Sequence, residues 1–424
     1  MFKFQNYKYG LLSGVLFGLS WNAYFPVLSL FLAFIPLLYV QKYLKPGFIE
    51  FFNISFLAFL IFHLVTVWWI SKSSIPGFLV VITLNSLFMA SVMGLFYIVS
   101  AKLNDNLAFL IFVVFWLSFE FFHYHWEISW PFMNLGNYLG QTTGWIQWYE
   151  FTGVLGGTLW VLLVNVLFFK SGYLFFQSKK KSGILIILSI GLIIIPITIS
   201  TWLMSRPFVN DGFVSVLLIQ PNINPYTEKY NRSLFEQQIN GQINLAKEKI
   251  EHQTQLIIYP EASFPLFLNN ENILGNKDVN RLKSLDNIHG NIDIIAGVFT
   301  FELKGPDTLY YNTAICLNST SDYTLYYKSK LVPAVERTPF ARYFSFLRDW
   351  NVDFGGVTSS LGISDERKVF KTNNAIVAPI ICYESVYGEF VTEFVQKGAD
   401  IITVMTNGAW WGNTQAYDQI LMQS

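Results

Sequence analysis

A glutamate, a lysine and a cysteine of this 424-residue chain have side chains that could take part in catalysis. Each comes at or after the end of an apolar run typical of a buried strand. Glu261 comes after residues 255–260, Lys328 lies at the end of a predicted β-pair, and Cys382 comes after residues 375–381. In α/β sheets, functional side chains gather just past strand ends. A carboxylate can act as a general base, a lysine can donate to a developing oxyanion, and a thiol can act as a nucleophile. The pattern therefore favours one catalytic site built from all three.

Glu261 follows a strand and a proline in the segment LIIYPEASFP, residues 256–265. Its neighbours are apolar, so burial is expected to raise the pKa of its carboxyl group and suit it to general-base work near neutral pH. The alternative is an ordinary loop carboxylate.

Lys328 belongs to the segment YYKSKLVPAVERTPF, residues 326–340. Strand alternation places Tyr326, Lys328 and Lys330 on one face. Glu336, eight residues past Lys328, is a candidate for holding the lysine or its loop. The alternative is a solvated, charged edge strand.

Cys382 stands where a strand gives way to a helix expected to begin near Ser385. Amides at a helix N-terminus favour the thiolate, so this position is expected to lower the pKa of the thiol. The adjacent amides of Tyr383 and Glu384 are candidates for an oxyanion hole. The alternative is a buried structural cysteine.

The second cysteine, Cys316, lies within a predicted strand and is expected to be core. A Cys316–Cys382 disulfide is an alternative in an oxidising compartment, although it would consume the proposed nucleophile. His252 and His289 lie in polar contexts away from the three segments. A Cys-His protease arrangement is therefore not expected.

Composition divides the chain into two parts. Apolar residues make up 53% of the sequence and charged residues 13%, against about 25% charged in an average soluble domain. Residues 1–209 hold 16 of the 56 Asp, Glu, Lys and Arg residues, and residues 210–424 hold the other 40. We therefore expect a transmembrane helical domain over 1–209 and a water-facing catalytic domain over 210–424. The formal net charge of zero does not suggest a nucleic-acid partner.

Most of the apolar segments in the first part approach the roughly 20 residues needed to cross a bilayer. The seven segments are residues 9–23, 26–40, 52–70, 76–100, 106–122, 151–173 and 183–204. The first two are expected to form a tight hairpin around Asn22 and Pro26. With a cytoplasmic N-terminus, nine lysines flank the inner side and only Lys72 lies in an outer loop, which is a strong positive-inside bias. Seven crossings then place residues 210 onward outside the cytoplasm.

One outer loop, residues 123–150, is rich in tryptophan and has no lysine or arginine. Tryptophan sits well at the headgroup level, so this loop is either an interfacial anchor or the rim of a lipid-entry groove. His123 and His125 have no third metal ligand nearby. We expect neither a metal site nor a cofactor.

The second part alternates strand and helix patterns. Strands are expected at residues 213–220, 255–259, 291–299, 309–317, 323–332, 375–381 and 399–405. An amphipathic helix is expected at residues 228–252. This order is typical of a layered α/β domain.

A glutamate, a lysine and a cysteine, each after a strand, resemble the nitrilase superfamily. The PE segment at Glu261, the K-x-x-LVP-x-x-E segment at Lys328 and the CYE segment at Cys382 resemble its membrane branch, the apolipoprotein N-acyltransferases. Further matches are QPNINPY (220–226), TNGAWWG (406–412) and WPFMNLG (130–136). The resemblance covers nearly the whole chain and implies that an αββα sandwich follows the multi-helix transmembrane domain.

The resemblance also implies roles for individual residues. It makes Glu261 the base, Lys328 the catalytic lysine and Cys382 the nucleophile, with support from Glu336, Tyr383 and Glu384. Trp410, Trp411 and Phe340 are candidate substrate contacts. The segment 337–349 is either a mobile lid or a packed loop. This chain departs from the family pattern at Gly408, where an Asp is frequent, and at Ala334 and Val335, which replace the first two residues of FGE.

The implied reaction takes place at a bacterial inner membrane, with the catalytic domain on the periplasmic side. A phospholipid is the acyl donor, Cys382 carries the acyl group as a thioester, and the amine of a diacylglyceryl-cysteine apolipoprotein is the acceptor. Members of the family are expected to continue past residue 424 with further strands and a last membrane helix. The alternatives are a membrane-tethered nitrilase-type amidase and a non-catalytic lipid-binding protein.

Overall fold

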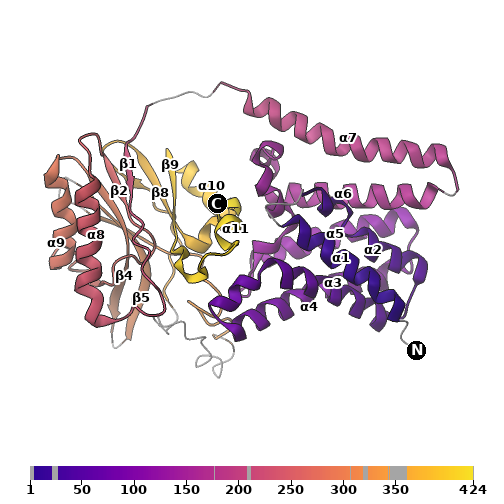
Figure 1. Cartoon of the computed structure of the whole chain (residues 1–424), viewed down its shortest axis with the longest axis horizontal. Helices are drawn as coiled ribbons and strands as arrows, with labels where there is room; N and C mark the ends of the chain where they lie inside the picture. The colour runs from indigo at the N-terminus through magenta and orange to yellow at the C-terminus, as the bar shows by residue number, and fades with distance from the viewer. Residues whose placement is uncertain are drawn as a thin grey trace. The chain divides into compact units, whose positions relative to one another are not determined.

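The computed structural model describes residues 4–21, 27–175, 177–207, 212–305, 307–318, 323–341, 343 and 361–423. The chain forms two compact units, one of residues 1–208 with 413–423 and the other of residues 209–412. Figure 1 shows helices throughout the first unit and a mixture of strands and helices in the second.

The first unit is helical. Its main helices are α1 (Tyr7–Ser20), α3 (Phe48–Thr66), α4 (Ile75–Ser100), α5 (Asp105–His123), α6 (Tyr149–Phe175) and α7 (Lys179–Met204). Between α1 and α3 run the short helices η2 (Val27–Leu32), α2 (Ile35–Tyr39) and η3 (Val40–Leu44). The hairpin expected around residues 22 and 26 lies outside the described residues.

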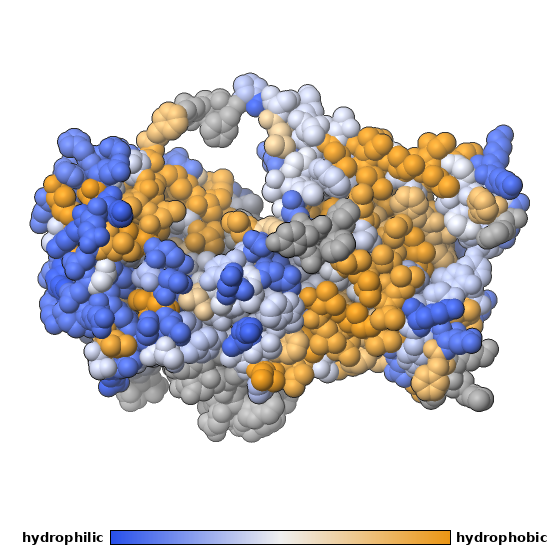
Figure 2. All heavy atoms as spheres, viewed as in Figure 1, coloured by the Kyte–Doolittle hydropathy of each residue, from blue (hydrophilic) through white to orange (hydrophobic). Residues whose placement is uncertain are grey.

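Within the described residues, six helical spans are long and apolar enough to cross a bilayer, with residues 27–44 counted as one span. Helix α1 has 14 residues and is shorter than these six. Figure 2 shows apolar side chains spread over the surface of this unit. On α7, Ile187, Ile195 and Trp202 are more than half exposed. A helix that is apolar on its exposed side is adapted to lipid, and the chain is a multi-pass membrane protein.

The middle of the tryptophan-rich loop is a packed part of the helical unit. Residues 131–139 are buried and form the short helices η5 (Pro131–Met133) and the start of η6 (Leu135–Trp145). Glu120 of α5 fastens this loop, because its carboxylate accepts hydrogen bonds from the Leu135 amide at 2.9 Å and the Thr158 hydroxyl at 2.5 Å.

Helix α11 (Ala416–Gln423) packs in the helical unit, although it follows the α/β unit in sequence. The Gln419 side chain accepts a hydrogen bond from the Trp69 indole at 2.7 Å and donates one to the Thr66 carbonyl at 3.0 Å. The Gln423 side chain donates to the Phe132 carbonyl at 2.7 Å. The α/β unit is therefore inserted in sequence between two stretches of the helical unit.

The α/β unit contains two sheets. The first has the strand order β1-β2-β4-β5-β6, with β3 also paired to β4. Its strands are β1 (Val216–Leu218), β2 (Leu256–Ile258), β3 (Phe267–Asn269), β4 (Asp293–Lys304), β5 (Asp307–Leu317) and β6 (Tyr323–Tyr327). The second has the order β7-β8-β9, with β7 (Phe370–Lys371), β8 (Ile376–Ile381) and β9 (Ile401–Met405).

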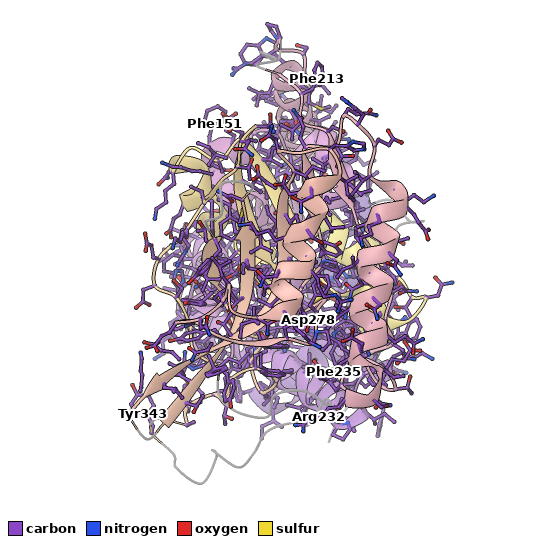
Figure 3. All side chains as sticks on the ribbon, turned by 90° about the vertical axis from the view of Figure 1, so that its left-hand side faces the viewer. Phe151, Phe213, Arg232, Phe235, Asp278 and Tyr343 are labelled. Carbon is purple, nitrogen blue, oxygen red and sulfur yellow. The ribbon has the colours of Figure 1, made fainter. Side chains whose placement is uncertain are left out.

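Helices cover the outer faces of the two sheets. Helices α8 (Phe235–Lys249) and α9 (Lys277–Lys283) cover the first sheet, and α10 (Gly388–Gln396) lies beside the second (Figure 1). Figure 3 shows α8 and α9 side by side, and Arg281 of α9 joins them through a 3.0 Å hydrogen bond to Glu236 of α8. Ile239 and Ile243 of α8 are buried in one core cluster with residues of β2 and β4. This layering is the nitrilase-like α/β fold that was expected.

The strands and helices differ from the predicted ranges mainly at their ends. The predicted helix at 228–252 begins at Phe235, because residues 225–230 form turns and Asn231 caps a 3-10 helix that starts at Arg232. The predicted strand at 323–332 ends at Tyr327. The next residue, Lys328, points its side chain toward Glu261 and binds it.

Candidate functional site

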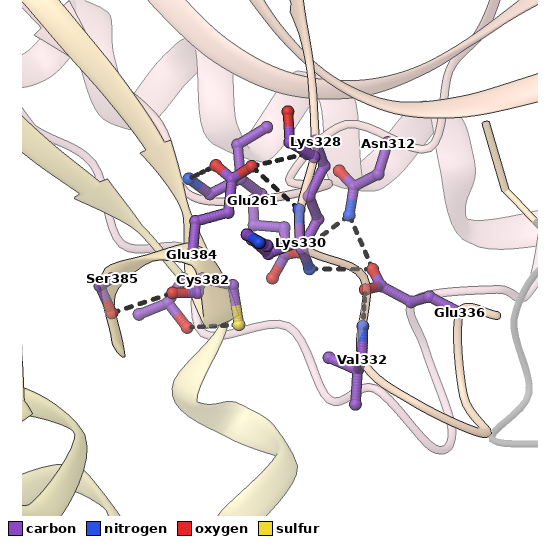
Figure 4. A network of polar contacts seen from close by, with 12 residues as sticks. Glu261, Asn312, Lys328, Lys330, Val332, Glu336, Cys382, Glu384 and Ser385 are labelled. Carbon is purple, nitrogen blue, oxygen red and sulfur yellow. Dashed lines mark hydrogen bonds and ion pairs between the residues drawn. The ribbon is translucent and has the colours of Figure 1, made fainter. Parts of the chain in front are cut away.

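Lys328 is the centre of a buried ion network in the α/β unit. Its ammonium donates hydrogen bonds to Glu261 Oε1 at 2.8 Å and to Glu336 Oε1 at 2.9 Å. Figure 4 shows the two carboxylates meeting the lysine from separate loops. The Lys328 side chain is 1% exposed. Buried charges need this kind of compensation, and the two carboxylates hold the pKa of Lys328 well above its usual value against the effect of burial.

Asn312 of β5 donates hydrogen bonds to the same two carboxylates. It was not predicted as a site residue from the sequence. Its side-chain amide donates to Glu261 Oε1 at 2.8 Å and to Glu336 Oε1 at 3.1 Å. The Asn312 carbonyl accepts a hydrogen bond from the Lys328 amide at 2.8 Å. The available signal was a single amide side chain within the apolar strand YYNTAICL, because a buried polar side chain requires a partner.

Glu261 lies in the loop after β2 and is buried. Gly297 of β4 permits this loop to approach, because a Cβ at Gly297 would lie 2.3 Å from the Ala262 amide nitrogen. Burial pushes the pKa of Glu261 up, but the charge and hydrogen bond of Lys328 outweigh it, so the pKa lies below its usual value. The expectation of a raised pKa was therefore wrong, because it considered burial without the lysine.

Cys382 joins β8 to the short 3-10 helix η10 (Cys382–Val386) and has a left-handed φ of 49°. The Thr406 hydroxyl donates to its sulfur at 3.4 Å. Burial, followed by the negative charge of Glu261, raises the pKa of the thiol to about 12, although Lys328 and Thr406 act in the opposite direction. The expected lowering by a helix N-terminus was wrong, because these effects exceed what one turn of 3-10 helix supplies.

Glu384 connects the strand that carries the cysteine to the strand that carries the lysine. Its Oε2 accepts from the Ile381 amide at 2.8 Å, and its Oε1 accepts from the Tyr326 hydroxyl at 2.7 Å and the Ser329 amide at 2.6 Å. It is fully buried, and burial raises its pKa to about 7. Tyr383 is buried beside it. Glu384 is therefore placed to align Cys382 with Lys328.

The loop after Lys328 folds around Glu336. Its Oε2 accepts a hydrogen bond from the Val332 amide at 2.8 Å. Ala334, one of the residues that depart from the family pattern, has a φ of 61° and lies in this turn. Lys330 does not share the face of Lys328 as strand alternation predicted. Its ammonium lies 4.9 Å from the ring centroid of Tyr387, because β6 has already ended.

Of the predicted substrate contacts, Trp410 is joined to the loop after β1. Its carbonyl accepts from the Tyr226 hydroxyl at 2.9 Å, and the two rings meet edge to face. Trp411 is half-buried beside it in the 3-10 helix η11 (Gly408–Trp411). Phe340 is half-buried in a turn with a φ of 58°. Much of the predicted lid segment 337–349 lies outside the described residues.

A pocket lies beside Glu261, and one of its lining residues, Lys229, was not predicted from the sequence. Lys229 lines this pocket together with Glu261, Asn222 and Asn407. Lys229 is 7% exposed. The signal that could have found it was a lysine in the QPNINPYTEK segment, close to the predicted site only through the fold.

Both cysteines are free thiols, which rules out the alternative of a disulfide in this structure. Cys316 is buried and its sulfur donates to the Asn318 side chain at 3.0 Å. Burial raises the pKa of its thiol. The prediction that Cys316 is a core residue is confirmed.

Comparison with known proteins agrees with this architecture. The domain described as "Apolipoprotein N-acyltransferase N-terminal domain" matches residues 13–167, and the domain described as "Carbon-nitrogen hydrolase" matches residues 216–424. Among solved structures, an amidase from Nesterenkonia sp. AN1 has a TM-score of 0.31 at 14% identity, covering 46% of this chain and 67% of that chain.

Similar proteins extend the match over nearly the whole chain. The apolipoprotein N-acyltransferase of Chlorobaculum tepidum is 26% identical over 95% of this chain and 79% of its own length. That of Aquifex aeolicus is 26% identical over 96% of this chain and 85% of its own length. With both domains matched in the same order, the chain belongs to the apolipoprotein N-acyltransferase family.

Proposed function

We propose that this chain transfers an acyl group from a membrane phospholipid to the amine of a diacylglyceryl-cysteine lipoprotein, through a thioester on Cys382. The observation that carries the proposal is the buried Lys328, which binds Glu261 at 2.8 Å and Glu336 at 2.9 Å. The charges of Glu261 and Lys328 both act on the Cys382 thiol. Family membership supports lipoprotein N-acylation as the overall reaction.

The first half-reaction forms the acyl-enzyme. Glu261 takes the thiol proton as the sulfur of Cys382 attacks the ester carbonyl of the phospholipid. A carbon–sulfur bond forms, the ester carbon–oxygen bond breaks, and the departing lysophospholipid oxygen receives the proton from Glu261. The thiol has a pKa of about 12 and Glu261 is ionised, so proton removal is expected to accompany attack rather than precede it.

Lys328 donates a hydrogen bond to the oxyanion in the proposed mechanism. Its ammonium has three donors, and two of them bind carboxylates. Among the described residues the third donor has no acceptor, which leaves it for the tetrahedral intermediate. The backbone amide of Tyr383, the residue after Cys382, is the candidate second donor.

The second half-reaction transfers the acyl group. The acceptor amine attacks the thioester and Glu261 receives the amine proton. The carbon–sulfur bond breaks to give an amide, and Glu261 returns the proton to the departing sulfur, which restores the Cys382 thiol. Both substrates are lipid-anchored, which agrees with a catalytic domain held by membrane helices over residues 1–209. The lysine bias supports placing the domain at 210–424 on the periplasmic side of a bacterial inner membrane.

The test uses the full chain in detergent or vesicles, phospholipid with a labelled acyl chain, and a diacylglyceryl lipopeptide. Labelled acyl-lipopeptide is expected from the wild type and not from Cys382→Ala. Labelled free acid in place of acyl-lipopeptide would support the amidase-like alternative. Transfer by Cys382→Ala at the wild-type rate would refute the thioester mechanism.

A further inference from the structure

Lys229 is a second buried ammonium beside the candidate site. It comes from the turn segment after β1, a different element from those that carry Lys328, and its side chain lines the pocket next to Glu261. It is 7% exposed. In the part of the chain that the structure describes, its ammonium has no hydrogen bond or ion pair and lies only near the rings of Tyr230 and Trp410, at 5.9 and 6.0 Å from their centroids.

An isolated ammonium is costly to bury unless an anion or a set of acceptors compensates it. Lys328 meets this requirement with two carboxylates. Among the described residues Lys229 has no such compensation. Burial lowers its pKa, and the nearby negative charge of Glu261 offsets only part of this effect. None of the described residues supplies its counter-charge, so a bound anion is expected to be its partner.

The pocket around Lys229 is equipped to bind an oxygen-rich anion. Asn222 and Asn407 line it, and each brings a side-chain amide with two N–H donors. The Asn407 side-chain oxygen accepts from the Ala409 amide at 3.2 Å, and its side-chain N–H groups have no acceptor in the part of the chain that the structure describes. Glu261 is engaged by Lys328 and Asn312.

The charges of the network also favour an anion-binding role. Glu261 and Glu336 carry two negative charges against the single positive charge of Lys328, and a protonated Lys229 balances the remaining negative charge. The proposed reaction adds one further negative charge at the carbonyl oxygen, and a phospholipid brings another on its phosphodiester. Both are anionic oxygens that a lysine ammonium recognises.

We propose that Lys229, with Asn222 and Asn407, forms an anion-binding subsite that takes a negatively charged oxygen of the acyl donor. This inference rests on the proposed function for the identity of the donor. The two sources of that oxygen are the donor's phosphodiester and the oxyanion formed at its ester carbonyl.

The first test needs no lipid. The full chain in detergent is alkylated at Cys382 by iodoacetate, which is anionic, or by neutral iodoacetamide, and the modified peptide is quantified by mass spectrometry. The ratio of the two rates cancels differences in thiolate content. Lys229→Met is expected to lower this ratio by about fivefold, the size of one partly screened charge contact. Lys229→Arg and the exposed-lysine control Lys249→Met are expected to keep it. An unchanged ratio in Lys229→Met would overturn the subsite.

The second test identifies the source of the oxygen. Formation of acyl-Cys382 is measured with a phospholipid and with a neutral acyl ester that has no phosphate. A loss in Lys229→Met with the phospholipid alone assigns the subsite to the phosphodiester, and a loss with both donors assigns it to the oxyanion. No loss with either donor would refute the inference. Failure of the wild type with both donors would instead refute the proposed function, while the alkylation ratio would still test the subsite.

A third measurement separates binding from folding. Removing an uncompensated buried charge is expected to leave the melting temperature of Lys229→Met equal to or above that of the wild type. A fall of several degrees, not restored by Lys229→Arg, would show that the lysine serves the fold and would contradict the inference.

Discussion

Glu384 Oε1 accepts a 2.6 Å hydrogen bond from the backbone amide of Ser329, the residue directly after Lys328. Glu384 itself lies two residues after Cys382. A single carboxylate therefore joins the end of the lysine's strand to the end of the cysteine's strand. Glu384 bonds to the backbone next to each proposed catalytic group and, among the described residues, has no hydrogen bond to the Cys382 sulfur or the Lys328 ammonium.

Glu384→Gln is expected to lower the rate of acyl-Cys382 formation by one to two orders of magnitude, and to destabilise the fold by about 1–3 kcal/mol. An amide presents one oxygen to donors that now share two, so at least one buried amide or hydroxyl loses its acceptor. Chemical denaturation measures the stability, and mass spectrometry measures acylation. The control Tyr326→Phe removes only the 2.7 Å hydroxyl bond and should cost about 1 kcal/mol with a smaller loss of rate. Equal rate losses in both variants would argue against an aligning role for the carboxylate.

Lys328→Met is expected to abolish acylation and to lower the free energy of unfolding by about 3 kcal/mol or more, because two buried carboxylates lose their cation. The triple variant Lys328→Met, Glu261→Gln, Glu336→Gln should recover stability without activity, since no unpaired charge remains. Thermal unfolding and acyl-enzyme formation are the two measurements. A single variant as stable as the wild type would mean that the ion network is weaker than its geometry indicates.

The acid limb of acylation should lie below pH 4.5. The pKa of Glu261 is lowered from an ordinary value of 4.5, so the base is ionised at neutral pH. Its contribution to activity, and its ion-pair contribution to stability, are lost only as the pH falls through the lowered pKa. The rate of acyl-Cys382 formation between pH 4 and 8 checks this. A rate that already halves near pH 6 would place the pKa of the base above its ordinary value.

Glu261→Gln should make the Cys382 thiol more reactive while it abolishes transfer. The Glu261 charge is the second largest cause of the raised thiol pKa, after burial. Removing that charge is expected to lower the pKa by about one unit and to speed iodoacetamide alkylation at pH 8 about tenfold. Lipopeptide acylation falls because the base is gone. A slower alkylation in this variant would show that Glu261 promotes the thiolate in the resting protein.

The orientation can be tested with introduced thiols in a background without native cysteines. Lys371→Cys lies at an exposed position of the α/β unit, and Lys102→Cys lies in the exposed turn between α4 and α5. An impermeant maleimide applied to intact spheroplasts should label the first and not the second until lysis, because the lysine bias places residue 102 inside. The reverse pattern would invert the proposed topology.

Residue types and positions after strands were enough to predict Glu261, Lys328 and Cys382 as one group. Glu336 was a candidate for holding Lys328 or its loop, and the structure agrees, since Glu336 binds Lys328 at 2.9 Å. The apolar segments likewise predicted the six membrane spans among the described residues, because length and hydropathy are local properties of a sequence. The first predicted segment, residues 9–23, instead forms most of α1, which has 14 residues and is shorter than these spans.

The electrostatics could not be predicted in the same way. The pKa directions of Glu261 and Cys382 were both inferred wrongly. That of Glu261 depends on Lys328, which lies 67 residues away in sequence. That of Cys382 depends first on burial and then on the charge of Glu261. Asn312 and Lys229 were missed for the same reason. The local signal of each was weak, a single polar side chain in its segment, and only the fold shows which groups lie next to it.

Cys382 has a left-handed backbone with a φ of 49°. At this position the residue that would best stabilise the fold differs from the residue that the proposed reaction requires. A residue with a Cβ bears a conformational penalty in this region that glycine does not. Glycine would relax the turn and remove the sulfur at the same time. Glycine, the residue best suited to this backbone, is thus expected to give an inactive protein under the proposed thioester mechanism, which requires the cysteine side chain at this strained position.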